Sequence, residues 1–277
     1  MATATPERIV IEPVRGFRGL NAREIWESRD LILFLAWRDI GVRYKQTILG
    51  PAWAILQPLA SLVVFTLIFG KVIGVPSQGV PYPVFCFAAL LPWQLFSSAI
   101  SGASNSMVGN AHLLSKVYFA RLAIPIASLL PPLADFVVSF VALLALMAWY
   151  GIHPGWEALW LPAVVLLTLA ISFGTGLWLA ALNVEYRDIR HVVPLALQFL
   201  LFVAPIAYPA TLISGRWRYV FGLNPMVGAI EAFRWALLGT PAPPPWEVAA
   251  SAVLSLALVV GGLVFFRLRE PQFADIV

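Results

Sequence analysis

Residues 37–58 read WRDIGVRYKQTILGPAWAILQP, and within this stretch the chain changes from charged to apolar sequence. Four charged residues stand before the change, and none occurs between Lys45 and Lys71. An uncharged apolar run of about 20 residues can cross a bilayer as a helix. The stretch therefore predicts the place where the chain first enters a membrane, with Gly50-Pro51 at the start of the first span.

The composition is that of a membrane protein. Of 277 residues, 60% are hydrophobic and 12% are charged, and the mean hydropathy is +0.85. Soluble domains carry about 25% charged residues. The net charge of +4 is expected in loops beside the spans, where it sets orientation, rather than on a nucleic-acid surface. The single cysteine, Cys86, cannot form an internal disulfide.

The apolar runs predict an all-α polytopic membrane protein with six transmembrane helices. Residues 1–48 are expected to form a cytoplasmic lead and an amphipathic interface helix, and residues 49–277 a transmembrane domain. We expect the spans at about 49–69, 84–104, 124–149, 159–182, 192–208 and 248–266. With a cytoplasmic N-terminus, fourteen of the 18 Lys and Arg residues lie inside, so both termini are expected to be cytoplasmic.

A helical period runs through residues 22–45. One face carries Trp26, Leu33, Trp37, Ile40 and Tyr44, and the opposite face carries Arg23, Glu27, Asp30, Arg38 and Lys45. An aromatic face opposite a charged face is typical of a helix that lies in the membrane interface. Asp39 and Arg43 are spaced to pair at i,i+4.

Residues 209–247 are more apolar than an ordinary external loop. They predict two short helices that dip into the outer leaflet, the second capped by Asn224, begun by Pro225 and ended by Gly239. Glu231 and Arg234 are spaced to pair at i,i+3. Irregular backbone at this depth persists where it packs in protein or faces water, which favours a position around an exit pore.

The sequence offers little catalytic chemistry. It has no G-x-x-x-x-G-K-[ST] loop, and the three histidines are far apart, so neither ATP binding by that route nor a metal site is expected. Asp135 is the one ionisable residue inside a predicted span. Such a residue is a functional candidate by default, but it stands near the cytoplasmic end and can also reach water or a basic loop residue.

Aromatic residues are plentiful, and most of them fit the belt at the membrane interfaces. A minority can line a path, because aromatic faces suit the apolar faces of sugar rings. The candidates for channel lining are Trp53, Phe65, Phe69, Phe96 and Tyr208.

Two cytoplasmic loops are candidates for docking a partner. The first, residues 110–125, contains a short apolar helix around 111–119, although it could be a solvated connector. The second, residues 183–190, is short and charged. Their candidate residues are Asn110, His112, Leu113, Lys116, Phe119, Arg121, Glu185, Arg187 and Asp188.

Four sequence patterns together resemble the ABC-2-type permeases that export polysaccharides such as O-antigen, capsule and teichoic acid. They are Trp37-Arg38-Asp39 through Gln57-Pro58-Leu59, the segment from Asn110 to Pro125, Asn183 with Tyr186-Arg187-Asp188, and Asn224-Pro225-Met226. The resemblance covers the chain from about Trp26 onward. Phe119-Ala120-Arg121 departs from it, with alanine in place of the expected proline.

The resemblance implies a homodimeric permease in the bacterial inner membrane, carrying two separate ATPase subunits. Those subunits would bind ATP and magnesium, and this chain would hold no cofactor and perform no catalysis. The segment 110–121 would be the coupling helix. The substrate would be a lipid-diphosphate-linked glycan, exported past an external gate containing Trp217, Tyr219, Phe221, Asn224, Pro225, Glu231 and Arg234.

The resemblance also gives the N-terminal helix a role. As the family's interface helix it would receive substrate through Trp26, Trp37, Arg38, Arg43, Tyr44 and Lys45. The arginines would attract the diphosphate, or would serve only orientation and contact with anionic lipid. Two alternatives to glycan export remain: an ABC-2 permease for a drug or small lipid, and a membrane-embedded sugar-transferring enzyme. A secondary transporter is disfavoured by the sparse buried charge.

Overall fold

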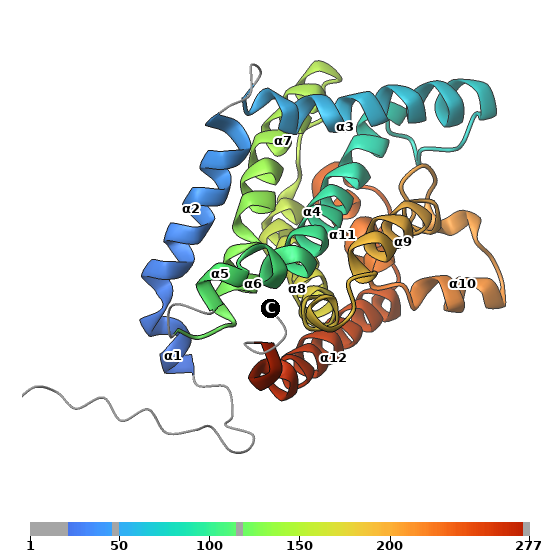
Figure 1. The fold of residues 1–277 in the computed structure, drawn as a ribbon. Helices are drawn as coiled ribbons and strands as arrows, with labels where there is room; N and C mark the ends of the chain where they lie inside the picture. Colours follow the sequence, from blue (N-terminus) through green and yellow to red (C-terminus); the bar gives the residue numbers. More distant parts are fainter. Residues whose placement is uncertain (1–21, 46–49, 115–118, 274–277) are drawn as a thin grey trace, which may run out of the picture.

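The computed structural model describes residues 22–45, 50–114 and 119–273, and every regular element in these ranges is a helix. The predicted all-α class is therefore confirmed (Figure 1). Residues 1–21, 46–49, 115–118 and 274–277 lie outside the described residues.

Five helical segments are long and apolar enough to cross a membrane. They are Ala52–Ile73, Tyr82–Gly109, Ala123–Trp149, Trp156–Glu185 and Pro245–Gln272. Each overlaps one of the predicted spans. The remaining predicted span, at 192–208, falls on α9 (Ile189–Val203), which has only 15 residues. At about 1.5 Å per residue, α9 is shorter than a hydrocarbon core of about 30 Å.

The N-terminal helical region consists of two helices, α1 (Ala22–Glu27) and α2 (Arg29–Lys45), which meet at Ser28. The side of α2 that packs on the bundle buries Ile32, Leu35 and Ala36. Trp26 and Trp37 point away from the bundle, being 69% and 77% exposed, whereas Tyr44 from the same predicted face is half-buried and contacts the bundle. An outward aromatic stripe is what a helix at the membrane interface requires.

The first and third spans are each built from two pieces. The first joins α3 (Ala52–Phe65) to a π-helical turn, η1 (Thr66–Ile73), which ends at Gly74 in the left-handed region with φ 72°. The third consists of α6 (Ala123–Ala127) and α7 (Leu130–Trp149). Pro131 and Pro132 both lie in the first turn of α7, where they need no backbone donor.

The second span, α4 (Tyr82–Gly109), is the central helix of the bundle, and it packs against α3, α7, α8 (Leu161–Glu185) and α11 (Pro225–Leu238). Small residues permit the close approach of these helices. A Cβ added to Gly176 of α8 would lie 2.5 Å from Ala103 Cβ of α4. Association of helices in lipid depends on such small-residue contacts, because lipid tails are as apolar as the side chains.

The last span, α12 (Pro245–Arg269), crosses α8 at a pair of glycines. A Cβ on Gly174 would meet the Leu258 backbone at 2.6 Å, and a Cβ on Gly262 would meet the Gly174 carbonyl at 2.7 Å. These distances are too short for any side chain. The C-terminal turn η4 (Glu270–Gln272) follows, and Phe273 then packs edge-on against Phe266.

Short helices complete the bundle. They are α5 (Ala111–Leu114), η2 (Trp156–Trp160), η3 (Ala210–Leu212) and α10 (Arg216–Gly222). Between α9 and α12, α10 and α11 are the two short helices predicted from the sequence. Asn224 caps α11 with a bond from the Met226 amide at 3.1 Å, Pro225 begins the helix and Gly239 ends it at φ 64°, as predicted.

Candidate functional site

A polar contact joins α2 to α7 at the edge of the bundle. Arg43 and Tyr44 from the end of α2 both donate to the carboxylate of Asp135 on α7. Asp135 therefore has its partners on the interfacial helix rather than in a loop. The sequence prediction that Arg43 pairs with Asp39 is wrong, because the bundle turns Arg43 toward Asp135.

A second contact lies one turn earlier on α2. Arg38 pairs with its neighbour Asp39 at 2.8 Å, and its guanidinium also donates to Asn110 Oδ1 at 2.8 Å. Asn110, at the end of α4, in turn donates to the Ser106 carbonyl at 2.9 Å. Arg38 and Asp39 thus lie toward the bundle, whereas Asp30 and Lys45 of the same helix are exposed.

Two cavities adjoin these contacts. The α2 cavity encloses about 280 Å³, and its polar lining comprises Arg38, Asp39, Arg43, Asn105, Ser106, Asn110 and Ser128. The α3 cavity encloses about 210 Å³, and its polar lining includes Gln57, Ser61, Gln94, Ser97, Ser98 and Asp135. Pro132 belongs to both linings. Amide and hydroxyl groups at a depth where lipid-facing helices are apolar mark a place for a polar ligand or water.

Sequence reasoning missed the α3 cavity. The sequence predictions rested on ionisable and aromatic residues in the spans, whereas all polar side chains of this lining except Asp135 are neutral amides and hydroxyls or the Trp93 indole. A signal was present, because Gln57 and Ser61, and likewise Gln94 and Ser98, stand four residues apart and so share one face of an apolar helix.

The predicted channel aromatics do not form one set. Phe65 lines the α3 cavity and stacks on Phe69 with centroids 5.5 Å apart. Phe96 is buried in the core against Trp93, at 5.4 Å. Trp53 is exposed on α3, and the Tyr208 hydroxyl donates to the Phe202 carbonyl at 3.0 Å. Phe96 packs within the core of this chain, and channel lining stays a prediction for all five residues.

The residues predicted to contact an ATPase fall at the ends of α4, α8 and α9. His112, Arg187 and Asp188 are exposed, and Leu113 and Phe119 pack partly on the core. Arg121 donates to the Glu270 carbonyl, and Glu185 pairs with Arg269 at 3.1 Å. Lys116 lies outside the described residues. The C-terminal turn is thereby fixed to both loops.

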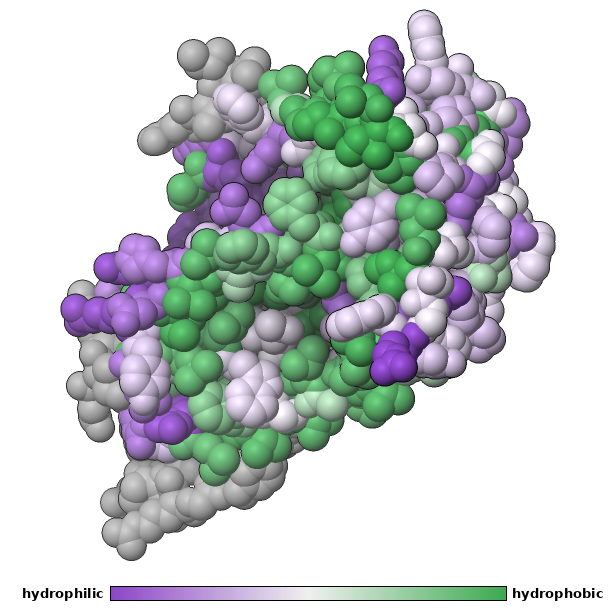
Figure 2. All heavy atoms as spheres, turned by 90° about the vertical axis from the view of Figure 1, so that its right-hand side faces the viewer, coloured by the Kyte–Doolittle hydropathy of each residue, from purple (hydrophilic) through white to green (hydrophobic). Residues whose placement is uncertain are grey.

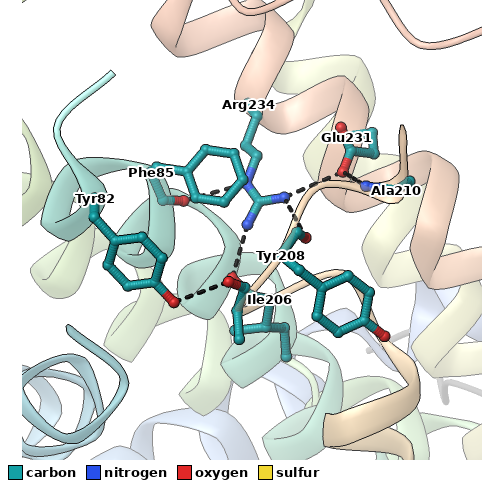
Figure 3. Close-up of polar contacts among 8 residues, drawn as sticks. Tyr82, Phe85, Ile206, Tyr208, Ala210, Glu231 and Arg234 are labelled. Carbon is teal, nitrogen blue, oxygen red and sulfur yellow. Dashed lines mark hydrogen bonds and ion pairs between the residues drawn. The ribbon is translucent and has the colours of Figure 1, made fainter. Parts of the chain in front are cut away.

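A buried ion pair holds the region after α9. Arg234 on α11 is 0% exposed and pairs with Glu231 at 3.1 Å, as the i,i+3 spacing predicted. Figure 3 shows the guanidinium at the centre of a fan of acceptors. It donates to the carbonyls of Ile206 at 2.8 Å, Phe85 at 3.2 Å and Tyr208 at 3.4 Å, and it lies 3.6 Å from the Phe85 ring centroid.

The Glu231–Arg234 pair supplies hydrogen-bond partners to backbone groups that lie outside a helix. Residues 204–209 run without regular structure after α9, so beyond the Ala204 amide, which donates to the Leu200 carbonyl at 2.9 Å, their backbone groups need partners from outside the helix. Arg234 takes two of the carbonyls, Tyr82 donates to the Ala207 carbonyl at 2.8 Å, and Glu231 accepts from the Ala210 amide at 3.0 Å. Irregular backbone within a membrane domain needs such partners.

The other predicted gate residues lie on α10 and at the start of α11. Trp217 and Tyr219 are exposed, and Tyr219 lies 5.3 Å from the Trp246 ring of α12. Phe221 lies 6.2 Å from the ring of Tyr208. Only α11, which carries Glu231 and Arg234, is largely buried.

Among the described residues, no cluster of three or more His, Cys, Asp or Glu side chains could hold a metal ion. The arrangement that remains is a helical membrane bundle with polar cavities, a peripheral N-terminal helix and a C-terminal turn that is bound to the loop before α6. These features define a membrane transport protein.

Comparison with known proteins gives the family. A description of the ABC-2 type transporter family matches residues 30–238, which is most of the chain. The chain therefore belongs to the ABC-2 type transporters.

Relatives of the chain cover nearly its whole length. It is 31% identical over 256 residues to the O-antigen export system permease protein RfbA of Myxococcus xanthus, covering 91% of this chain and 97% of that relative. It is 26% identical over 249 residues to RfbA of Klebsiella pneumoniae, covering 90% and 95%. It is 29% identical over 244 residues to the polysialic acid transport protein KpsM of Escherichia coli, covering 86% and 92%.

Proposed function

We propose that this chain is the membrane-spanning permease of an ABC transporter that exports a lipid-linked, O-antigen-like polysaccharide across the bacterial inner membrane. The observation that carries the proposal is the similarity, over almost the full length of both chains, to an O-antigen export permease. The neutral polar lining of the α3 cavity supports it, because amides and hydroxyls can bind sugar hydroxyl groups without selecting for charge.

The permease acts as a homodimer in this proposal, with the glycan path between the two copies. Only 11% of the most apolar window of the first span is buried, compared with 78% of that of α4. The exposed part of α3 includes the amide of Gln57, which is costly against lipid but suits a partner or a wet path. Figure 2 shows the side of the molecule that carries α9 and α10. Hydrophobic residues form a broad area over much of this side.

Two cytoplasmic ATPase subunits supply the energy, binding ATP and magnesium themselves. The proposed docking surface is the end of the bundle where α4, α8 and α12 finish, with exposed His112, Arg187 and Asp188 available to a partner. Arg121 contacts the C-terminal turn and Glu185 pairs with Arg269 at the end of α12, so a movement of either loop is transmitted to the end of α12. Both chain termini are cytoplasmic in this arrangement, as the distribution of basic residues predicts.

The additional crossing, between α8 and α12 in the chain, combines α9 with the irregular segment after it. The 15 residues of α9 are too few alone, and residues 204–209 continue the crossing as irregular backbone of bends and turns. The contacts of Arg234 and Tyr82 support this reading, since they provide the hydrogen bonds that lipid cannot. On the far side, α10 and α11 form the external gate, with Trp217 and Tyr219 at its exposed surface.

Depletion of the protein in its host tests the function. We expect a lipid-linked glycan to accumulate on the cytoplasmic side while its amount at the cell surface falls, and analysis of the accumulated material would identify the sugar. A catalytically inactive ATPase partner should give the same accumulation. Normal surface glycan together with lost export of a dye or small lipid would refute the proposal.

A further inference from the structure

The ion pair between Arg43 and Asp135 lies between the two cavities. Arg43 belongs to the lining of the α2 cavity, Asp135 to that of the α3 cavity, and Pro132 to both. The ion pair between these two side chains therefore spans the boundary between the two cavities. The pair is not sealed from water, because the side chains are 43% and 24% exposed. Ion pairs with this exposure are held weakly and can be exchanged.

The two cavities differ in charge. The α2 cavity contains two arginines, Arg38 and Arg43, and one carboxylate, Asp39, which is already paired with Arg38. Among the described residues that line the α3 cavity, Asp135 is the single charged one, and the other polar groups are amides and hydroxyls. The first cavity thus suits an anion. The second suits neutral hydroxyl groups, and the carboxylate at its boundary repels anions.

We propose that Arg43 exchanges Asp135 for a phosphate group of a lipid in the α2 cavity, and that this exchange opens the way to the α3 cavity. The inference rests on the proposed function, in which the substrate enters beside α2. The planar guanidinium can bind two phosphate oxygens at once, and a diphosphate can contact Arg38 as well. Tyr44 remains as a hydrogen-bond donor to the released carboxylate.

The released Asp135 keeps the two parts of a lipid-linked glycan apart. Its negative charge stands at the boundary of the α3 cavity, so the phosphate stays beside the arginines of the α2 cavity. The sugar units carry hydroxyls and can pass to Gln57, Gln94 and the serines beyond. Asp135 is therefore a positioning residue: it holds Arg43 before the lipid arrives and bars the phosphate afterwards.

The test measures lipid affinity in the complete permease–ATPase complex, reconstituted in nanodiscs of neutral lipid. The probe is a fluorescent polyprenyl diphosphate without sugars, with unlabelled polyprenyl diphosphate and phosphatidylglycerol as competitors. The variants are Asp135→Asn, Arg43→Gln and Arg43→Lys. The control is Arg29→Gln, which removes the same charge from the same helix at a pair that is 55% and 86% exposed.

The exchange predicts a specific pattern. Asp135→Asn frees Arg43 and should tighten binding about two- to fivefold, the range expected for losing a competing exposed pair. Arg43→Gln should weaken binding about tenfold or more, since it removes charge-assisted bonds to the phosphate. Arg43→Lys keeps a partner for Asp135 but loses the two-pronged contact, so it should also weaken binding. Arg29→Gln should change it by less than about twofold.

If the Arg43–Asp135 pair only holds α2 against α7, Asp135→Asn should not tighten lipid binding. Unchanged or weaker binding in a monodisperse Asp135→Asn complex, or unchanged binding in Arg43→Lys, would overturn the exchange. Stronger competition by polyprenyl diphosphate than by phosphatidylglycerol assigns the site to the substrate lipid, as proposed; equal competition overturns that assignment in favour of bilayer lipid. These affinities do not depend on the depletion result, so failure of the proposed function can be told apart from failure of the exchange.

Discussion

Replacing Arg234 by methionine tests whether the buried pair holds the region after α9. The substitution keeps much of the side-chain length but removes the charge and all donors. It leaves the Glu231 carboxylate in a buried site with the Ala210 amide, at 3.0 Å, as its remaining hydrogen-bond partner among the described residues, and it leaves the carbonyls of Ile206 and Tyr208 without the Arg234 donor. Breaking a buried pair by removing one partner costs about 3–5 kcal/mol.

The measurement is the free energy of unfolding in mixed micelles of sodium dodecyl sulfate and a mild detergent, with refolding checked in each case. Arg29→Met is the matched control, because it makes the same chemical change at an exposed pair with Asp30. That control should cost less than about 1 kcal/mol. Arg234→Lys should fall between the two, since an ammonium keeps the charge but cannot reach the same fan of acceptors.

A double variant separates the charge effect from the loss of packing. Arg234→Met combined with Glu231→Leu leaves no buried unpaired charge, so its cost should be smaller than the sum of the two single costs. If Arg234→Met costs no more than Arg29→Met, the pair does not hold this part of the structure. If the costs of the two single substitutions simply add, the two side chains are not coupled.

Three further substitutions test the packing and the caps. Gly174→Ala should destabilise the fold by about 1–3 kcal/mol, because the new Cβ would meet the α12 backbone at 2.6 Å; Gly41→Ala, with nothing within 4 Å, should not, and equal unfolding energies would refute the close crossing. Asn224→Ala should cost about 1 kcal/mol through loss of the cap bond, with Asn224→Ser largely restoring it. Gly239→Ala should cost about 1–2 kcal/mol at φ 64°, and an unchanged stability would show that α11 does not end in the left-handed conformation.

Much of the fold follows from local sequence patterns. The apolar runs are long and separated by charged or proline-rich loops, so five spans could be placed within several residues. The ends of α11 were predicted as the structure has them, because Asn224, Pro225 and Gly239 act through backbone geometry within a few residues of themselves. The pair of Glu231 and Arg234 is likewise set by helical spacing alone.

What could not be predicted depends on contacts between distant segments. Arg43 lies four residues after Asp39, but its partner is Asp135 in another helix, and no spacing along the chain reveals that choice. The short α9 read as a full span because the apolar sequence continues past Val203, while the backbone after it leaves the helix and is held by α4 and α11. The α3 cavity escaped notice because its lining is shared among several helices.

The contacts of Arg234 also bear on the order in which the protein is made. Its hydrogen-bond acceptors, Phe85, Ile206, Tyr208 and Glu231, all precede it in the chain. During synthesis the acceptors therefore leave the ribosome before the arginine does. Because Glu231 and Arg234 lie one helical turn apart, α11 can reach the bundle with its two opposite charges already neighbours. The fully buried Arg234 guanidinium thus needs no later segment of the chain to neutralise its charge.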